Sequence, residues 1–159
     1  MEKALFAAGC FWGVQFYFDE VPGVLKTTVG YTGGHTKNPS YEDVSYKNTG
    51  HAEATLVEFD PKKVSYETLV KQFFYMHDPT QMNRQGPDEG SQYRSAIFYF
   101  DDEQKKVAEA IKDETQKGHE KPIVTEITKV SEFYEAEDYH QKYTEKTGRG
   151  MCHVQYKLM

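Results

Sequence analysis

Near the start of the chain, Gly9-Cys10-Phe11-Trp12-Gly13 joins two segments of different periodicity. A short apolar run, residues 4–8, comes before it, and an amphipathic run, residues 14–18, comes after it. This order predicts a strand, a sharp glycine turn and then a helix over about 11–19. Cys10 is therefore expected at or just before the first turn of that helix.

A cysteine at the start of a helix differs chemically from one elsewhere. Unpaired backbone N–H groups and the positive end of the helix dipole favour an anion there. The thiol then loses its proton more easily than one with the usual pKa of about 8.5. The ordinary alternative is a small buried apolar residue. The glycines on both sides, the helix-start position and the adjacent Phe11-Trp12 pair favour a nucleophile at Cys10.

The bulk composition indicates a single domain spanning residues 1–159. The net charge of −6 argues against sequence-independent binding to nucleic-acid phosphates. No apolar run reaches the roughly 18 residues that a membrane span needs, and no charged and apolar leader precedes Lys3. We therefore expect a cytoplasmic protein that binds neither nucleic acid nor membrane.

The cysteine and histidine patterns give no support to a metal site or a disulfide scaffold. The chain has two cysteines, Cys10 and Cys152, at opposite ends and outside any C-x-x-C pair. The six histidines show no H-E-x-x-H spacing. We expect no metal and no cofactor. In a reducing compartment, such a cysteine pair favours a catalytic role over a structural one.

Periodicity along the chain predicts an α+β protein. The order is βαββαβ followed by a further αβ unit, which suits a two-layer sandwich with a ferredoxin-like core of the split βαβ kind. A last short helix over 136–147 and a mobile tail over 148–159 complete the prediction. The expected strands are 3–8, 24–32, 54–59, 94–100 and 123–130; the expected helices before the last one are 11–19, 65–77 and 101–117.

Two long polar loops, 33–50 and 80–92, interrupt this pattern. Long loops inside a compact domain are usually functional, and these carry Tyr41 and lead to Tyr93, each with an O–H donor. The glycines of 30–34 do not form a dinucleotide fingerprint. Glu53 enters its strand where a carboxyl group can be partly desolvated, which favours its protonated form. Packing or plain surface exposure is the ordinary alternative for each of these residues.

A thiolate, neutral O–H donors and an aromatic wall together suit a sulfoxide substrate. The sulfur of a sulfoxide is electrophilic only when its oxygen is protonated or strongly hydrogen-bonded, and its methyl group prefers an apolar, aromatic pocket. Attack by Cys10 would leave methionine and a sulfenic acid on Cys10. A sulfenic acid condenses readily with a second thiol, and Cys152 is the other cysteine of the chain.

Nearly the whole chain resembles an A-type peptide methionine sulfoxide reductase. Gly-Cys-Phe-Trp-Gly together with Gly-His-Ala-Glu is a highly specific combination. The matching segments are 9–13, Gly-Tyr-Thr-Gly-Gly at 30–34, Asn-Pro-Ser-Tyr-Glu-Asp-Val at 38–44, 50–53, His-Asp-Pro-Thr at 77–80, Asn-Arg-Gln-Gly at 83–86, Gln-Tyr-Arg-Ser at 92–95, Ala-Glu-Asp-Tyr-His-Gln at 136–141 and Cys-His at 152–153.

The resemblance implies roles for the matching residues. Cys10 resembles the nucleophile, and Phe11 with Trp12 resembles the wall that holds the methyl group of the sulfoxide. Cys152 resembles the resolving thiol. The implied substrate is the S epimer of methionine sulfoxide, either the single amino acid or within oxidised proteins, and the implied reductant is thioredoxin. The implied biological role is repair of oxidative damage.

Four further residues would polarise or orient the sulfoxide oxygen. Glu53 is similar to the acid that donates to that oxygen, and Tyr41 and Tyr93 are similar to additional donors. Asp88 resembles a polar residue that orients the site through water. Pro87 stands where the family usually has asparagine, which puts the geometry of the Asp88 loop in question.

The C-terminal end departs from the family in two ways. Met151 precedes Cys152 where tyrosine is common, and the sequence ends seven residues after Cys152, without the second recycling cysteine of some members. We therefore predict a one-step resolution through a Cys10–Cys152 disulfide.

Two other functions remain open from the sequence. A Cys-His hydrolase or acyltransferase would need His51 within hydrogen-bond reach of Cys10 as a base. A non-catalytic module would use Phe11 and Trp12 as a pocket for a methyl thioether. Turnover of methionine sulfoxide in the presence of dithiothreitol separates these possibilities from a reductase.

Overall fold

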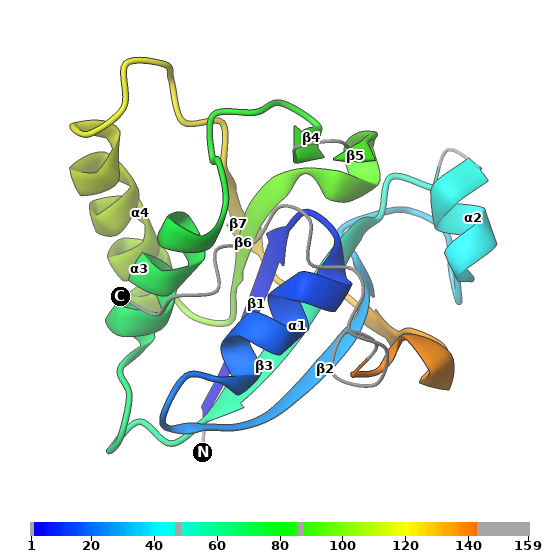
Figure 1. Ribbon diagram of the computed structural model, residues 1–159, viewed down its shortest axis with the longest axis horizontal. Helices are drawn as coiled ribbons and strands as arrows, with labels where there is room; N and C mark the ends of the chain where they lie inside the picture. The colour runs from blue at the N-terminus through cyan, green and yellow to red at the C-terminus, as the bar shows by residue number, and fades with distance from the viewer. Residues whose placement is uncertain (1, 47–48, 86–87, 143–159) are drawn as a thin grey trace.

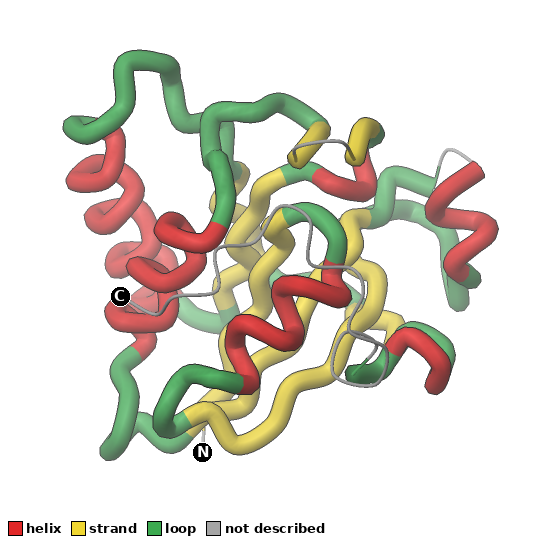
Figure 2. The backbone as a smooth tube through the Cα atoms, in the orientation of Figure 1, coloured by secondary structure: helices red, strands yellow, loops and turns green. Residues whose placement is uncertain are grey.

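The computed structural model describes residues 2–46, 49–85 and 88–142 (Figure 1). Helices and strands alternate along most of this part of the chain (Figure 2). The helices are α1 (Phe11–Asp19), α2 (Tyr41–Tyr46), α3 (Tyr66–Met76) and α4 (Asp102–Gln116), with 3-10 turns η1 (Ser91–Tyr93) and η2 (Asp138–His140). The strands are β1 (Glu2–Ala8), β2 (Val24–Thr32), β3 (Ala52–Phe59), β4 (Arg84–Gln85), β5 (Asp88–Glu89), β6 (Ser95–Tyr99), β7 (Glu126–Lys129) and β8 (Phe133–Glu135).

Most of the strands form one mixed sheet in the order β7-β6-β1-β3-β2-β8. Strand β1 lies in the middle and pairs antiparallel with both β3 and β6. Strand β2 pairs antiparallel with β3, which sets Tyr31 opposite Glu53. The pair β6–β7 is parallel, while β8 runs antiparallel to β2 at the other edge. The predicted α+β class is confirmed.

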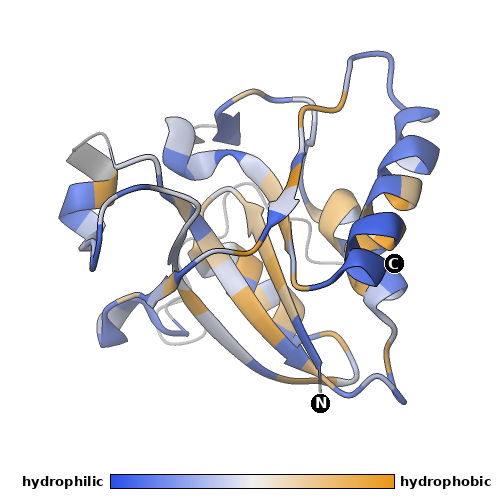
Figure 3. Cartoon of the chain, turned by 180° about the vertical axis from the view of Figure 1, so that it is seen from behind, coloured by the Kyte–Doolittle hydropathy of each residue, from blue (hydrophilic) through white to orange (hydrophobic). Residues whose placement is uncertain are grey.

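The sheet curls strongly, because its two edge strands are neighbours along the chain. Only residues 130–132 separate β7 from β8. At about 4.8 Å per strand, the edges of a flat sheet of this size would lie about 24 Å apart, whereas four residue steps span at most about 14 Å. Figure 3 shows this connection crossing the sheet face. Val130 N–H donates to the Tyr99 carbonyl at 2.9 Å, and Thr32 Oγ1 donates to the Glu132 carbonyl at 2.8 Å.

The two faces of the sheet bury different side chains. On the helix side, Phe6 of β1 stacks on Phe18 of α1 at 5.2 Å and on Phe73 of α3 at 5.3 Å. Alternate residues of the same strands point to the other face, where small side chains accommodate the curl. That second cluster consists of Leu5, Ala7, Ala52, Ala54, Ala96 and Phe98.

Side-chain caps mark the starts of two of the predicted helices. Ser65 caps α3, since its Oγ accepts a hydrogen bond from Thr68 N–H at 3.0 Å. Asp101 caps α4 in the same way, with Oδ1 accepting from Gln104 N–H at 2.8 Å.

The first long loop is less irregular than predicted, because it contains α2. Ser40 N–H donates to Asp43 Oδ2 at 3.1 Å, and Asp43 N–H donates to Ser40 Oγ at 3.1 Å. This reciprocal pair is a capping box, which starts a helix without any apolar periodicity. The second long loop likewise contains β4, β5 and η1.

The predicted helix over 136–147 is wrong for the residues that the structure describes there. Ala136 N–H donates to the Val29 carbonyl at 2.9 Å, so the chain follows the edge of β2 and turns only once, in η2. Strand β8 was not predicted, and β7 is shorter than the predicted 123–130. Residues 143–147 and the predicted tail, with Cys152, lie outside the described residues.

Candidate active site

Cys10 lies where the sequence places it, between a central strand and a helix. Strand β1 ends at Ala8, Gly9 turns the chain with a φ of 92°, and Cys10 is the N-cap residue of α1. A positive φ of this size favours glycine, which explains the residue before Cys10. The Cys10 side chain is largely buried, with 8% of the residue exposed. The thiol therefore sits at the positive end of the helix dipole.

Glu53 lies beside this helix start. It is only 1% exposed, and its Oε1 accepts a hydrogen bond from the backbone N–H of Phe11 at 3.2 Å. Strand β3 thus delivers a buried carboxyl group to the residue directly after Cys10. The sequence predicted partial desolvation of Glu53, and the structure buries it almost completely.

Aromatic rings surround the first turn of α1. The Phe11 ring contacts the Tyr31 ring at 5.6 Å and the His140 ring at 5.4 Å between centroids. The Trp12 ring stacks on Tyr41 at 6.4 Å and on His140 at 5.6 Å. The structure therefore brings together Phe11, Trp12 and Tyr41, which come from two elements far apart in the sequence.

The Glu137 carboxylate accepts hydrogen bonds from two of the aromatic residues around α1. Its Oε1 accepts from the Tyr31 hydroxyl at 3.3 Å, and its Oε2 accepts from Tyr41 N–H at 3.3 Å. Burial opposes its charge, but hydrogen bonds from its own backbone N–H and from Tyr41, with His140 nearby, lower the pKa of Glu137 below its usual value. Burial first, and then the Glu137 and Glu53 carboxylates, raise the pKa of Tyr31, so its hydroxyl stays a neutral donor.

His51 does not provide the base that a Cys-His hydrolase would need. Its Nδ1 accepts from Gly34 N–H at 3.1 Å, so Nε2 carries the hydrogen and donates to the Thr36 carbonyl at 2.6 Å. Both ring nitrogens are thus committed to the backbone, and the side chain is buried. His51 holds the turn after β2 in place.

Comparison with known proteins agrees with this geometry. A family model for peptide methionine sulfoxide reductase matches residues 2–159. The chain belongs to this family. The peptide methionine sulfoxide reductase MsrA of Methanosarcina acetivorans is 59% identical over 150 residues, which cover 93% of this chain and 80% of the relative.

Solved structures show the same fold. The reduced form of Mxr1 from Saccharomyces cerevisiae superimposes with a TM-score of 0.87 at 36% identity, over 94% of this chain and 87% of Mxr1. Mxr1 in complex with Trx2 superimposes with a TM-score of 0.64 at 27% identity, over 89% of this chain and 84% of that one.

For three of the residues predicted from the family resemblance, the structure gives only the element or no position at all. Tyr93 ends η1, which packs against β3, the strand of Glu53. Asp88 begins β5 and pairs with Gln85 of β4, but its side chain is not among the described ones. Cys152 lies outside the described residues.

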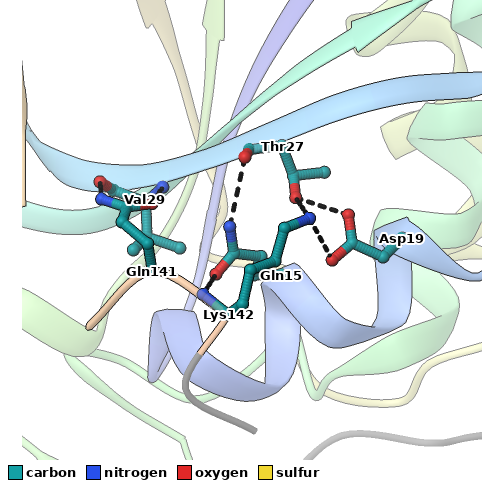
Figure 4. A network of polar contacts seen from close by, with 6 residues as sticks. All are labelled: Gln15, Asp19, Thr27, Val29, Gln141 and Lys142. Atoms are coloured by element: carbon teal, nitrogen blue, oxygen red, sulfur yellow. Dashed lines mark hydrogen bonds and ion pairs between the residues drawn. The ribbon is translucent and has the colours of Figure 1, made fainter. Parts of the chain in front are cut away.

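The segment that leads toward Cys152 is held against α1 and β2 by a polar network (Figure 4). The Gln141 side chain accepts from Val29 N–H at 3.0 Å and donates to the Val29 carbonyl at 2.9 Å. Lys142 N–H donates to Gln15 Oε1 at 2.6 Å, and its Nζ contacts Asp19 Oδ2 at 2.6 Å. Lys142, with a φ of 59°, is thereby fixed on the helix that begins after Cys10.

Glu137 and His140 received no individual role from the sequence. The sequence signal for both residues was the family segment 136–141, since the helix predicted over 136–147 gives neither residue a chemical role. Among residues 2–46, 49–85 and 88–142, no group of three or more histidine, cysteine or acidic residues gathers as a metal site, and no helix is long and apolar enough to cross a membrane.

Proposed function

We propose that this protein reduces methionine S-sulfoxide, in proteins or as the single amino acid, and so repairs oxidative damage. The observation that carries the proposal is the placement of Cys10 at the start of α1, with the buried Glu53 carboxyl hydrogen-bonded to the next residue. Membership of the peptide methionine sulfoxide reductase family supports it.

In the first step, the Cys10 thiolate attacks the sulfur of the sulfoxide while the sulfoxide oxygen takes up a proton. Glu53 in its protonated form donates to that oxygen, and the Tyr41 and Tyr93 hydroxyls add hydrogen bonds. Phe11 and Trp12 form the wall for the methyl group. The S–O oxygen passes to Cys10, so methionine leaves as the two-electron reduction product and Cys10 becomes a sulfenic acid.

In the second step, the Cys152 thiol attacks the Cys10 sulfenic acid. A disulfide forms and water leaves. Thioredoxin then reduces the Cys10–Cys152 disulfide by thiol–disulfide exchange and is itself oxidised. The complex of the similar protein Mxr1 with Trx2 supports this partner. Asp88 orients the site through water. Regeneration by thioredoxin suits the reducing cytoplasm, where we place the protein.

The sheet order also supports a finer description of the fold. The pairing order β6-β1-β3-β2, with α1 after β1 and α3 after β3, fits a ferredoxin-like βαββαβ core in a single domain over 1–159. Strands β7 and β8 extend this core at its two edges. This arrangement sets β1, which leads to Cys10, beside β3, which carries Glu53.

The direct test uses pure epimers of a methionine sulfoxide peptide with dithiothreitol as reductant. We expect turnover of the S epimer and no turnover of the R epimer or of simple esters. Ester hydrolysis lost in Cys10→Ser, or binding without turnover, would overturn the proposal.

A further inference from the structure

His140 is a buried polar residue next to the proposed methyl wall. It is 1% exposed and packs against Phe11 at 5.4 Å, Trp12 at 5.6 Å and Tyr41 at 4.6 Å between ring centroids. Its Nδ1 lies 2.9 Å from Trp12 Nε1. A residue about 130 positions from α1 therefore contacts every ring that is proposed to shape the methyl pocket.

The Trp12 contact fixes the protonation state of His140. An indole N–H is a donor only, so Nδ1 of His140 must accept and must carry no hydrogen. The hydrogen of the neutral ring is then on Nε2, which is buried and has no hydrogen-bond partner among the described residues. The interaction therefore exists only with the uncharged imidazole.

The turn that carries His140 is held rigidly. The Glu137 carboxylate accepts from Tyr31 and Tyr41, and the Gln141 side chain pairs with both backbone groups of Val29. These contacts fix the residues on both sides of His140 to β2 and α2. The imidazole thus approaches Trp12 from a preorganised support rather than from a loose loop.

Protonation would reverse the contact, because imidazolium presents donors at both nitrogens. Burial lowers the pKa of His140 and outweighs the opposite effect of Glu137, so the ring is neutral at pH 7. The titratable groups that face the Phe11–Trp12–His140 stack are Glu137 and Tyr139 from the same segment, Tyr41 from α2, Tyr31 from β2, and Cys10 and Glu53 across Phe11.

We propose that His140 is a positioning residue for substrate: its neutral ring accepts the Trp12 indole N–H and so holds the indole in the orientation that receives the sulfoxide methyl group. This inference rests on the proposed role of Trp12 in substrate binding. Protonation of His140 releases the indole and weakens substrate binding without changing the chemistry at Cys10.

The first test compares two substitutions of the same side chain. His140→Leu removes the acceptor, whereas His140→Asn keeps an acceptor oxygen near the position of Nδ1. We expect KM for a methionine sulfoxide peptide to rise about tenfold in His140→Leu and about twofold in His140→Asn. The single-turnover rate at saturating substrate changes less than about threefold in both. Equal KM values for the two variants would overturn the proposal, and far-UV circular dichroism checks that both are folded.

A double-mutant cycle with Trp12→Phe separates this inference from the proposed function. Phenylalanine has no N–H to position, so adding His140→Leu to Trp12→Phe should change KM less than about twofold. A full His140→Leu effect in that background overturns the inference alone. If Trp12→Phe itself leaves KM unchanged, the proposed methyl wall is wrong and this inference fails with it.

The second test uses the emission of Trp12, the single tryptophan of the chain. On titration from about pH 8 to about pH 5, we expect a transition with its midpoint below 6.5, the usual histidine pKa. The transition should be absent in His140→Asn and retained in His119→Asn, a control that lies after α4. Emission that does not change in the wild type, or that changes equally in His140→Asn, would overturn the proposal.

Discussion

The buried carboxyl group of Glu53 accepts a hydrogen bond from the backbone N–H of Phe11 at 3.2 Å. Phe11 is the first residue of α1 and directly follows Cys10. A helix start usually leaves such N–H groups to water or to an anion. Here one of them orients an acid beside the thiol. The proposed nucleophile and the proposed proton donor are thus linked through one peptide unit, although Cys10 caps α1 and Glu53 lies in β3.

Replacing Glu53 by glutamine tests its role as proton donor. The amide oxygen still accepts from Phe11 N–H, so the fold is retained, but an amide cannot transfer a proton to the sulfoxide oxygen. General acid catalysis contributes about 100-fold or more, so we expect the single-turnover rate to fall by at least about that factor in Glu53→Gln. A rate within about threefold of wild type would show that Glu53 is not the donor.

The Tyr41 and Tyr93 hydroxyls are expected to share the sulfoxide oxygen. Each single Tyr→Phe substitution removes one hydrogen bond and should slow the single-turnover rate by about fivefold. The double variant should lose more than the product of the two, because no hydroxyl donor then replaces the other. Tyr75→Phe, at an exposed position of α3, is the matched control. If Tyr41→Phe, Tyr93→Phe and the double variant all react at the wild-type rate, these hydroxyls do not take part in the reaction.

Parts of this site could be predicted from the sequence because their signals are local. The apolar run, Gly9 and the amphipathic run place Cys10 at a helix start. By contrast, the burial of Glu53 depends on β2 and α1 packing against β3. Such long-range packing has no local signature.

The C-terminal half of the site shows why prediction fails there. Residues 136–142 have helix-forming side chains, but Ala136 and Gln141 make backbone-like hydrogen bonds to Val29, more than a hundred residues away. These contacts override local propensity and turn the expected helix into an edge segment with one 3-10 turn. His140 reaches Trp12 because this segment follows the edge of β2 instead of forming a helix. Helix α2 has a local signal, the capping box of Ser40 and Asp43, but the polar composition of residues 33–50 gives it no apolar periodicity.

The lowered pKa of Glu137 makes the stability of the folded protein depend on pH. A carboxylate whose pKa is lowered on folding stabilises the protein above its unfolded pKa of about 4.5, and this contribution is lost as the pH falls through the lower, folded value. Glu137→Gln should therefore unfold at a lower temperature than wild type at pH 7, and the gap should close on acidification below about pH 4. Thermal unfolding followed by circular dichroism measures both. A gap that widens toward low pH contradicts this role.

Gly30 allows β8 to close over the sheet edge. A Cβ at this position would lie 2.3 Å from the Tyr134 carbonyl oxygen and 2.6 Å from Phe133 Cζ. Gly30→Ala should therefore lower the free energy of unfolding by more than about 2 kcal/mol, because backbone atoms must move. Gly118→Ala is the control, since its Cβ would meet its nearest neighbour, the Thr115 carbonyl, at 3.6 Å. In urea denaturation, the free energy of unfolding of Gly118→Ala should lie within about 0.5 kcal/mol of wild type. Similar losses of unfolding free energy in both variants would contradict this account.

The attack of Cys10 on the sulfoxide is tested most directly by the intact mass of the protein after one equivalent of methionine sulfoxide without reductant. We predict one methionine per protein and a protein mass lower by two hydrogens, from a Cys10–Cys152 disulfide. Cys152→Ser should also release one methionine but gain one oxygen as the Cys10 sulfenic acid. Methionine formed by Cys10→Ser, or an unchanged wild-type mass without methionine, would contradict the account.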